Sequence, residues 1–482
     1  MNFLTLNDLL LKVLEYNPEE VRYIKRAYDY AEYLHRGQLR KRGEPYIIHP
    51  LNVAYILAEE HADRNTVCAG LLHDTLEDTK ITKEEIAQDF NPDIANLVDG
   101  VTKISKMNFS TKQAQNDANT RKIITSVRND VRIMIIKLAD RLHNMRTMQF
   151  QPEEKQKENA LETLEVYVPF AYYLGSYKIK SELEDLALRY YNPEAYKENE
   201  EIRYKIEEEN QPLLEEMKHK IDCFLTYKEI PHEIKIRIKN IYGIYKKTLE
   251  KKDISDIHDL LALKIMVNEI DECYRTLGIV HEEYRPINAK FKDYICNPKT
   301  NMYRSLHTTV FAPNNMLVQN QIRTFDMDRV ASFGLTAYWD TKKGQARDIM
   351  QSELRNKFQF FQSLTEIDEM FLDNKEFVQK IKEELFTDKV YIYTPKGDII
   401  ELPKGSTPID LAYKIHTDIG NSMIGALINY KTQSIDYLLK TKDRVKILTS
   451  PSSEGPKEDW LEKAHTSLAK RKIKEFYRKT TI

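Results

Sequence analysis

Four imidazole and acidic side chains stand close together in the six residues HDTLED, at positions 73–78. If this segment is helical, Glu77 lies one turn beyond His73 and Asp78 one turn beyond Asp74, so two adjacent stripes each carry a polar pair. The preceding residues, 67–72, are apolar or small, which indicates that the cluster follows a buried helix. Buried imidazoles and carboxylates need partners, and a divalent cation is the simplest common partner.

A second segment, IMIIKLADRLHNM at 133–145, repeats the pattern. The residues before Asp140 are nearly all apolar, whereas Asp140, His143, Asn144 and Thr147 share one helix face at offsets of three, four and seven. An acidic group within an apolar helix is costly unless a metal or hydrogen bonds compensate it. Satisfied core polar residues would explain one His-Asp dipeptide better. Two such segments, with His49 at the end of GEPYIIHP, favour a metal site instead.

Two histidines and two aspartates without cysteine suit Mn²⁺, Fe²⁺ or Mg²⁺ better than a closed structural zinc site. Such an ion would leave positions for water and a phosphate oxygen. Glu77 and Asp78 follow at once, placed to orient and deprotonate that water. The basic loop 40–42 before His49 would supply cations for a polyphosphate. A solvated basic loop explains those residues equally well if the metal site is not beside them.

Cations also alternate along a later segment. Lys235, Arg237 and Lys239 share one face of an expected strand, and Lys246 and Lys247 follow on an expected helix. Such a face would suit a triphosphate.

Four more candidates follow in the same region. Asp259 opens the strand-like segment DLLALKIMV and is a candidate magnesium ligand, Tyr303 could stack on a base, and Lys292 and His307 could contact phosphates. Each of these signals is weak alone, because such side chains on a strand are usually only part of the surface.

The elements that must position these residues divide the chain into three kinds of structure. Apolar spacing of three and four predicts almost continuous helix from about 5 to 190, including 46–60, 65–76, 82–90 and 122–148. The charged stretch 192–220 is expected to be a solvated helix that joins two domains. Beyond residue 230 the pattern changes to α/β, with strands expected at 232–239, 262–267, 305–311 and 317–324 and a helix at 242–251.

A small α+β module follows. Short strands are expected at 389–393, 398–402, 426–427 and 445–448, with a helix at 408–416 and a basic helix from Pro456 onward. Pro395 and Gly397 predict the hairpin turn between the first two strands.

The bulk composition excludes several classes of protein. A chain of 482 residues is too long for one core. Its 73 Lys and Arg nearly balance 75 Asp and Glu, so any basic site must be local. Four scattered cysteines argue against a disulfide framework and a thiol-rich metal site. There is no apolar run of about 18 residues, so we expect no membrane contact and a cytoplasmic location.

The motifs RGQLRKRGEPYIIHP, LLHDTLEDT, DGVTKI and KLADRLHNMRTM resemble the HD hydrolase domain of the RelA/SpoT homologue family over most of residues 20–175. The resemblance implies a manganese-dependent (p)ppGpp 3′-pyrophosphohydrolase of the stringent response, in which Glu77 and Asp78 handle the water. It implies metal ligands at His49, His73, Asp74 and Asp140, and nucleotide contacts at Arg40, Lys41, Asn144 and Thr147.

The α/β region is similar to the synthetase domain of the same family through IRIKNIYGIYKK, HDLLALKIMV, KFKDYICNPK, YRSLHTTVF and QIRT. That domain transfers pyrophosphate from ATP to GDP or GTP with Mg²⁺. The resemblance implies a nucleotide and magnesium site formed by Arg237, Lys239, Lys247, Asp259, Lys292, Tyr303, His307 and position 319.

Three residues depart from the family's synthetase pattern. Gln319 replaces the Glu that helps hold Mg²⁺ and activates the 3′-hydroxyl, Met302 replaces a Gly, and Lys264 replaces an Arg. Loss of a general base typically costs about 10²–10⁴-fold in rate. We therefore expect synthesis to be severely weakened or lost, unless Asp326 or Asp328 supplies the missing carboxylate.

Residues 387–450 look like a TGS domain, which in long family members contacts the 3′ end of uncharged tRNA; His416 matches the position involved. The expected domain order is an all-α HD-type domain (1–190), an α/β nucleotidyltransferase-like domain (191–345), a helical spacer (346–386), an α+β ubiquitin-like TGS domain (387–450) and a basic helix (451–482). Partners implied are ppGpp and pppGpp, GDP, GTP and ATP, and uncharged tRNA or the ribosome.

Three functions remain in view. The first is a (p)ppGpp hydrolase with a weakened synthetase domain. The second is a fully bifunctional synthetase and hydrolase, which Gln319 counts against. The third is a sensor that binds alarmone or tRNA without catalysis, which the pair Glu77 and Asp78 counts against, because binding alone needs no water-activating groups.

Overall fold

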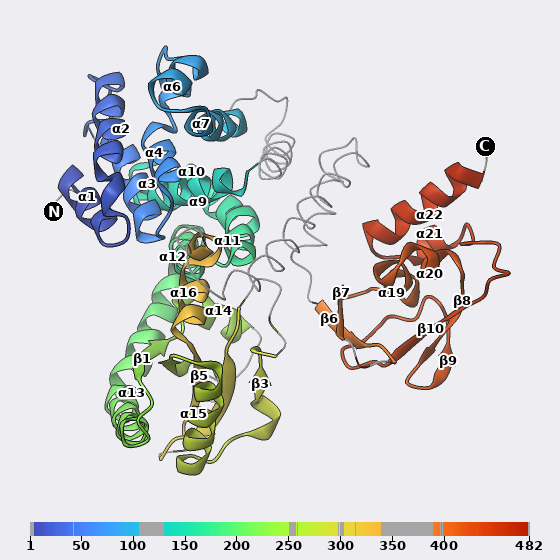
Figure 1. Cartoon of the computed structure of the whole chain (residues 1–482). Coiled ribbons are helices and arrows are strands. Elements are labelled where there is room, and N and C mark those ends of the chain that lie inside the picture. The colour runs from blue at the N-terminus through green and yellow to red at the C-terminus, as the bar shows by residue number, and fades with distance from the viewer. Residues whose placement is uncertain are drawn as a thin grey trace. The chain divides into compact units, whose positions relative to one another are not determined.

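The computed structural model describes residues 4–41, 43–105, 130–249, 257, 259–296, 298, 303–313, 315–338, 389–395, 397 and 399–480. These residues fall into two compact units (Figure 1). The first unit holds a helical domain and a domain built on a five-stranded sheet, and the second holds residues 389–480. The expected spacer at 346–386 lies outside the described residues.

In its described residues, 4–41, 43–105 and 130–190, the helical domain confirms the expectation of nearly continuous helix. A π-helical turn, Thr163–Tyr167, separates two of its helices. The helices are α1 Leu6–Leu14, α2 Val21–Leu34, α3 Ile48–Glu59, α4 Arg64–Leu72, α5 Thr75–Asp78, α6 Lys83–Asp89, α7 Pro92–Ser105, α9 Val131–Arg146, α10 Glu153–Glu162, α11 Val168–Leu174 and α12 Tyr177–Tyr191.

Polar residues fix where several of these helices begin and end. Asp63 and Asp130 are the N-caps of α4 and α9, and their carboxylates accept hydrogen bonds from first-turn amides. Gly175, at φ +81°, ends α11 in the left-handed region that suits glycine. The described part of the helix expected at 122–148 is α9, and residues 122–129 lie outside the described residues.

The single helix expected over 65–76, continuing through HDTLED, is wrong. α4 ends at Leu72, His73 is its C-cap, and α5 begins only at Thr75. Two side chains bond the last carbonyls of α4: His73 Nδ1 lies 2.8 Å from the Gly70 oxygen, and the Thr75 hydroxyl donates to the Leu72 oxygen at 2.6 Å. His73 and Asp74 therefore lie in a bend between helices, not on two stripes of one helix.

The long helix α13, Pro193–Tyr227, continues beyond the charged stretch and is not solvated throughout. In its second half Leu214, Met217, Ile221 and Leu225 are fully buried in the core of the sheet domain. α13 is thus part of that domain as well as a connection to the helical one.

The sheet domain confirms the four expected strands and adds a short fifth one. Its strand order is β1-β2-β5-β4-β3, with β2 and β5 parallel and the other neighbours antiparallel. The bounds are β1 His232–Ile238, α14 Ile241–Leu249, β2 Leu261–Val267, α15 Ile270–Glu283, β3 Lys292–Asp293, β4 Leu306–Phe311, β5 Leu317–Thr324 and α16 Phe325–Phe333.

Strand register divides the sheet into an apolar and a polar face. Paired residues on neighbouring strands point to the same side. One row consists of Ile234, Ile265, Ile322 and Leu306, and it belongs to the core that α13 and α15 cover. The next row, on the opposite face, carries polar side chains across all five strands: Lys235, Lys264, Gln321, His307 and Lys292.

The C-terminal unit has the expected α+β composition. A two-stranded sheet of β6 (Lys389–Tyr393) and β7 (Ile399–Pro403) and a three-stranded sheet in the order β10-β8-β9 are joined by a bridge between Tyr393 and Arg444. The remaining elements are α19 Pro408–Ile415, α20 Thr417–Asn421, β8 Met423–Ile428, β9 Lys431–Gln433, β10 Val445–Thr449, α21 Trp460–Lys463 and α22 Ser467–Thr480.

The expectation of one helix after Pro456 is wrong, because α21 and α22 are separate. The helix is interrupted where the buried carboxylate of Asp410 accepts hydrogen bonds from the amides of His465 and Thr466 and from the Thr466 hydroxyl. Trp460 and Ile473 pack into the same core as α19. In neither unit do the described residues contain a helix with the length and apolar character that a membrane span requires.

Candidate metal centre

Three elements bring four predicted ligands together in the helical domain. His49 lies in the first turn of α3, His73 and Asp74 lie in the bend after α4, and Asp140 lies in α9. One ligand atom each from His49, His73 and Asp140 lies within 4.8 Å of the others. Asp74 is outside that closest group but adjoins it, with Oδ1 3.1 Å from His73 Nε2 and Oδ2 3.5 Å from His49 Nε2.

The orientation of His73 fits a cation. Its Nδ1 bonds the Gly70 carbonyl at 2.8 Å, so Nδ1 carries the proton and Nε2 presents a lone pair to the cluster. His73 Nε2 is buried and has no hydrogen-bond partner. An orphaned imidazole nitrogen beside two carboxylates is costly unless something positive occupies the space between them. The donor set therefore fits a divalent metal that accepts nitrogen and oxygen ligands.

Asp140 is held in its ionised form by neighbours on its own helix. Asn144 Nδ2 donates to Asp140 Oδ1 at 2.6 Å, and Lys137 Nζ donates to Oδ2 at 3.1 Å. Burial alone would raise the pKa of Asp140, but the charges and hydrogen bonds of Lys137, His49 and His73 lower that pKa well below its usual value. Oδ1 also faces His49 Nε2 at 3.3 Å, so this oxygen is the one available to an ion.

Two residues beside the ligands carry signals that the sequence reasoning did not use. Lys137 is a charged residue inside an apolar run, which is a sign of a buried ionic partner. Tyr46 stands three positions before His49, and its hydroxyl donates to Asp74 Oδ2 at 2.8 Å. Burial, with the carboxylates of Asp74 and Asp78 next, raises the pKa of Tyr46, so this hydroxyl stays a donor.

His143 lies against His49 in the same buried cluster. The two Nδ1 atoms are 2.7 Å apart, so one imidazole donates to the other. Burial, then the charges of His49 and Arg40, lowers the pKa of His143 to about 2. A neutral pair is consistent with His49 keeping Nε2 for the cluster.

The predicted nucleotide contacts adjoin the ligands. Arg40 Nη2 donates to Asn144 Oδ1 at 3.2 Å, and Lys41 Nζ donates to Gln151 at 2.6 Å. Thr147 ends α9, where its hydroxyl donates to the His143 carbonyl at 3.1 Å. The basic loop is therefore joined to the C-terminal end of the ligand helix.

The predicted water-handling residues Glu77 and Asp78 lie on α5, directly after the ligand bend, and both are exposed. The backbone carbonyl of Asp78 accepts a hydrogen bond from Gln38 at 3.0 Å. This contact connects the segment just before the basic loop to the end of α5.

The sheet domain places its predicted site residues on the polar face. His307 and Lys292 lie in the polar row. Arg237 and Gln319 lie on the same face of the sheet, two positions along their strands from that row, and both are in register with Ala262. Tyr303 and His307 are buried and share a hydrogen bond of 2.8 Å. Lys239 pairs with Asp259 just before β2, and Lys247 lies in the last turn of α14.

Among the described residues, Gln319 and Asp328 both have partners of their own. Gln319 accepts a hydrogen bond from Gln321 at 2.8 Å, and Asp328 pairs with Arg323 at 2.8 Å. Burial, then Arg323, lowers the pKa of Lys264 to about 8. Asp326 is in the first turn of α16, and Met302 lies outside the described residues.

In the C-terminal unit, His416 has a local structural role. It is the N-cap of α20, where Nδ1 accepts from the Asp418 amide at 3.2 Å, and its side chain is exposed.

Three family models match the chain in the order that the fold shows. They are an HD domain at residues 27–177, a region found in RelA/SpoT proteins at 236–346 and a TGS domain at 390–449. The order of an all-α HD domain, a synthetase-type α/β domain and a TGS domain is therefore confirmed.

Similar proteins are named either as GTP pyrophosphokinases or as 3′-pyrophosphohydrolases. A GTP pyrophosphokinase of Myxococcus xanthus is 43% identical over 469 residues, which are 96% of this chain and 61% of that protein. A guanosine-3′,5′-bis(diphosphate) 3′-pyrophosphohydrolase of Aquifex aeolicus is 44% identical over 482 residues, 98% of this chain and 67% of that one. A solved metazoan ortholog of SpoT is 28% identical and covers 34% of this chain and 93% of its own, with a TM-score of 0.29. The chain thus spans about three fifths to two thirds of the length of these curated relatives.

Proposed function

This chain belongs to the RelA/SpoT family, and from that premise we propose that its helical domain hydrolyses ppGpp to GDP and pyrophosphate. Water would add to the 3′-diphosphate, the 3′ C–O–P linkage would break on the phosphorus side, and the 3′-oxygen would take up a proton. The observation that carries the proposal is the convergence of His49, His73 and Asp140, with the buried Nε2 of His73 lacking a hydrogen-bond partner.

The proposed cofactor is Mn²⁺, held by His49, His73, Asp74 and Asp140. A divalent cation in this position would polarise a phosphate oxygen and make a nearby water more acidic. Asp74 and Asp140 supply negative charge, and the neutral imidazoles supply lone pairs in fixed directions.

The remaining residues have proposed roles that follow from their places. Glu77 and Asp78, exposed on α5, would orient the water and accept its proton. Arg40 and Lys41 would bind the diphosphate that leaves, and Asn144 and Thr147 would hold the rest of the nucleotide from the end of α9.

Incubation of the protein with Mn²⁺ and ppGpp, followed by ion-exchange chromatography, tests the proposal. We expect GDP and pyrophosphate in equal amounts, and neither product from the variant Glu77→Gln/Asp78→Asn. If both proteins bind Mn²⁺ but the wild type shows no turnover, the domain is a sensor and the hydrolase proposal fails.

A second proposal concerns the sheet domain: it binds GTP or GDP and ATP with Mg²⁺ but synthesises pppGpp or ppGpp weakly or not at all. The polar row and Arg237 offer the cations that nucleotide phosphates need. Gln319, however, is a neutral amide hydrogen-bonded to Gln321, and Asp328 is engaged by Arg323. A neutral amide neither accepts the 3′-hydroxyl proton nor balances the charge of Mg²⁺.

Restoring the carboxylate tests this proposal. Gln319→Glu should raise pppGpp formation from ATP and GTP by about 10²-fold or more, with Gln321→Glu as the matched control on the same strand and face. Synthesis by the wild type at ordinary enzyme concentrations would show instead a fully bifunctional enzyme.

For the TGS domain, contact with uncharged tRNA is also a proposal. It rests on the match of residues 390–449 to the TGS model and on the exposure of His416. His416→Asn keeps an N-cap residue. It should weaken binding of deacylated tRNA if the ring is the contact, and leave it unchanged if the ring only caps α20.

A further inference from the structure

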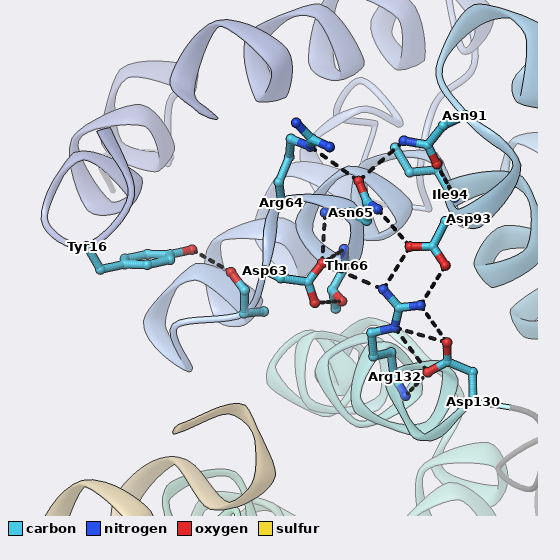
Figure 2. Close-up of polar contacts among 11 residues, drawn as sticks. Tyr16, Asp63, Arg64, Asn65, Thr66, Asn91, Asp93, Ile94, Asp130 and Arg132 are labelled. Carbon is cyan, nitrogen blue, oxygen red and sulfur yellow. Dashed lines mark hydrogen bonds and ion pairs between the residues drawn. The ribbon is translucent and has the colours of Figure 1, made fainter. Parts of the chain in front are cut away.

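Arg132, near the start of α9, lies among three carboxylates about two helical turns from the metal centre. Its guanidinium donates to Asp93 through both terminal nitrogens, at 2.8 and 2.6 Å, and to Asp130 at 2.6 Å. Asp63 is a further partner at 3.7 Å. Figure 2 shows the fork of Arg132 between Asp93 and Asp130. Its side chain is 19% exposed, so solvent screens these contacts only in part.

Each carboxylate belongs to the beginning of a different helix. Asp63 caps α4 by accepting from the amides of Asn65 and Thr66, and Asp130 caps α9 by accepting from the amide of Arg132. Asp93 lies in the first turn of α7 and also accepts from the side chain of Asn65 at 2.7 Å. One guanidinium therefore ties together the first turns of α4, α7 and α9.

The two capped helices that reach the metal centre place their ligands at the same distance from their N-caps. His73 stands ten positions after Asp63, and Asp140 stands ten positions after Asp130. At a rise of 1.5 Å per residue, each helix carries its ligand about 15 Å from its N-cap. The caps share Arg132 at one end, and His73 Nε2 lies 4.0 Å from Asp140 Oδ1 at the other. α4 and α9 thus run parallel from one fixed base to one site.

We propose that Arg132 is a positioning residue for the metal centre: by fixing the starts of α4 and α9 to one another, it sets the separation of His73 and Asp140. The inference rests on the proposed metal site and adds to it a residue that touches no ligand atom. Relative slippage of the two helices by a fraction of an ångström would change the ligand distances by a similar amount, because helices transmit axial shifts along their length.

A purely structural role for Arg132 makes a different prediction. If Arg132 only stabilised the fold, its loss would lower the unfolding temperature but leave metal affinity unchanged in the molecules that remain folded. If it positions ligands, affinity falls even in a variant that is fully folded. Arg132→Lys keeps the charge but cannot fork between two carboxylates, and Asp93→Asn keeps the volume but removes one of them.

The experiment measures the dissociation constant of Mn²⁺ from the full chain through the electron paramagnetic resonance signal of free Mn²⁺. We expect at least fivefold weaker binding for Arg132→Lys and for Asp93→Asn, and a double variant little worse than either single one, since both break the same contact. Turnover of ppGpp by each variant should recover when Mn²⁺ is raised to saturation. Lys83→Met, which removes the 3.0 Å pair with Asp99 between α6 and α7, is the control and should keep wild-type affinity.

Wild-type Mn²⁺ affinity in folded Arg132→Lys and Asp93→Asn would overturn the inference while leaving the proposed hydrolase intact. Absence of both Mn²⁺ binding and hydrolysis in the wild type would overturn the proposed function and this inference with it. The wild-type measurement distinguishes the two failures.

Discussion

Lys137 is a buried cation that pairs with Asp140, one of the proposed metal ligands. It is buried in α9 and donates to Asp140, and burial of such a pair is tolerated only while both partners are present. Burial, the largest single effect, lowers the pKa of Lys137, but the charges of Asp140, Tyr167 and Asp74 together outweigh burial and raise that pKa. The pair therefore remains ionised without metal.

Asp140→Asn should accordingly cost about 3 kcal/mol in the free energy of unfolding measured by urea in the presence of a chelator, because a buried ammonium loses its carboxylate. Adding Lys137→Met should recover more than half of that loss without recovering metal binding. The exposed pair Lys25 and Asp29 in α2 is the comparison, and its double variant should change stability by less than about 1 kcal/mol. Equal losses in the single and double α9 variants would contradict the explanation.

Glu60, at the end of α3, is a second buried titratable group, and its effect on stability depends on pH. Burial, opposed by Lys178, raises the pKa of Glu60 to about 8. The folded protein keeps this proton up to about pH 8, while the unfolded chain releases it near the ordinary value, so stability falls as pH rises from about 4.5 to 8.

Glu60→Gln should remove that slope and increase the free energy of unfolding at pH 8 by up to about 5 kcal/mol. Urea unfolding at several pH values measures it, and Glu59→Gln, next in sequence and paired with Lys178, should keep the wild-type slope. Parallel curves for wild type and Glu60→Gln would show that Glu60 is ionised in the folded state.

At the scale of elements, Asp410 determines how the chain after the TGS strands is divided. Its carboxylate also accepts from the amide and hydroxyl of Thr407, which starts α19. One side chain thus caps α19 and separates α21 from α22.

Asp410→Asn should therefore cost about 2–3 kcal/mol, since hydrogen bonds to a charged group are the stronger kind. Native-state hydrogen exchange at residues 464–469 should become faster, while α9 is unaffected. Asp418→Asn, with an exposed carboxylate in the same unit, should leave those rates unchanged.

The elements also show where sequence patterns suffice and where they do not. The sequence predicted β1, β2, β4 and β5 to within about two residues. Alternation indicated the partly exposed β1, and a short apolar run indicated the buried β2. The break between α21 and α22 depends on Asp410, 55 positions from His465, so no local pattern announces it.

The ligands of the candidate metal site could also be predicted from a sequence pattern. His49, His73, Asp74 and Asp140 stand out because polar ligands interrupt apolar helices, and the structure does bring them together. The break at His73 was not predictable, because no glycine or proline marks it and His73 keeps a helical backbone at φ −61°. The partners Lys137, Tyr46 and Arg132 needed three-dimensional contacts to be recognised.

At the scale of the whole molecule, the helical and sheet domains meet in one compact unit. Phe333 of α16 stacks on His61, after α3, with ring centroids 4.4 Å apart. Asn240, before α14, donates to Asp185 of α12 at 3.0 Å. Gly334 follows Phe333 at φ +61°, and a Cβ there would lie 2.2 Å from the Leu174 carbonyl oxygen.

Gly334→Ala should therefore separate α16 from the turn between α11 and α12, because both the backbone angle and the available space exclude a side chain. Hydrogen exchange at residues 174–176 should become faster and the unfolding temperature should fall. Gly278→Ala in α15, where a Cβ meets nothing within 4 Å, should be neutral or slightly stabilising. Unchanged exchange at 174–176 would contradict this close approach.

The long helix α13 determines where the chain could be cut to give a stable fragment of the sheet domain. Its acidic first half suggests a convenient place to cut, yet a fragment that begins at residue 221 would lack Leu214 and Met217, which are fully buried beneath the sheet. A sheet domain excised at the end of the charged stretch would expose an apolar groove along β1 and would be expected to aggregate. An autonomous fragment must instead start before Ile206, and so must carry with it much of the segment that its sequence marks as a connector.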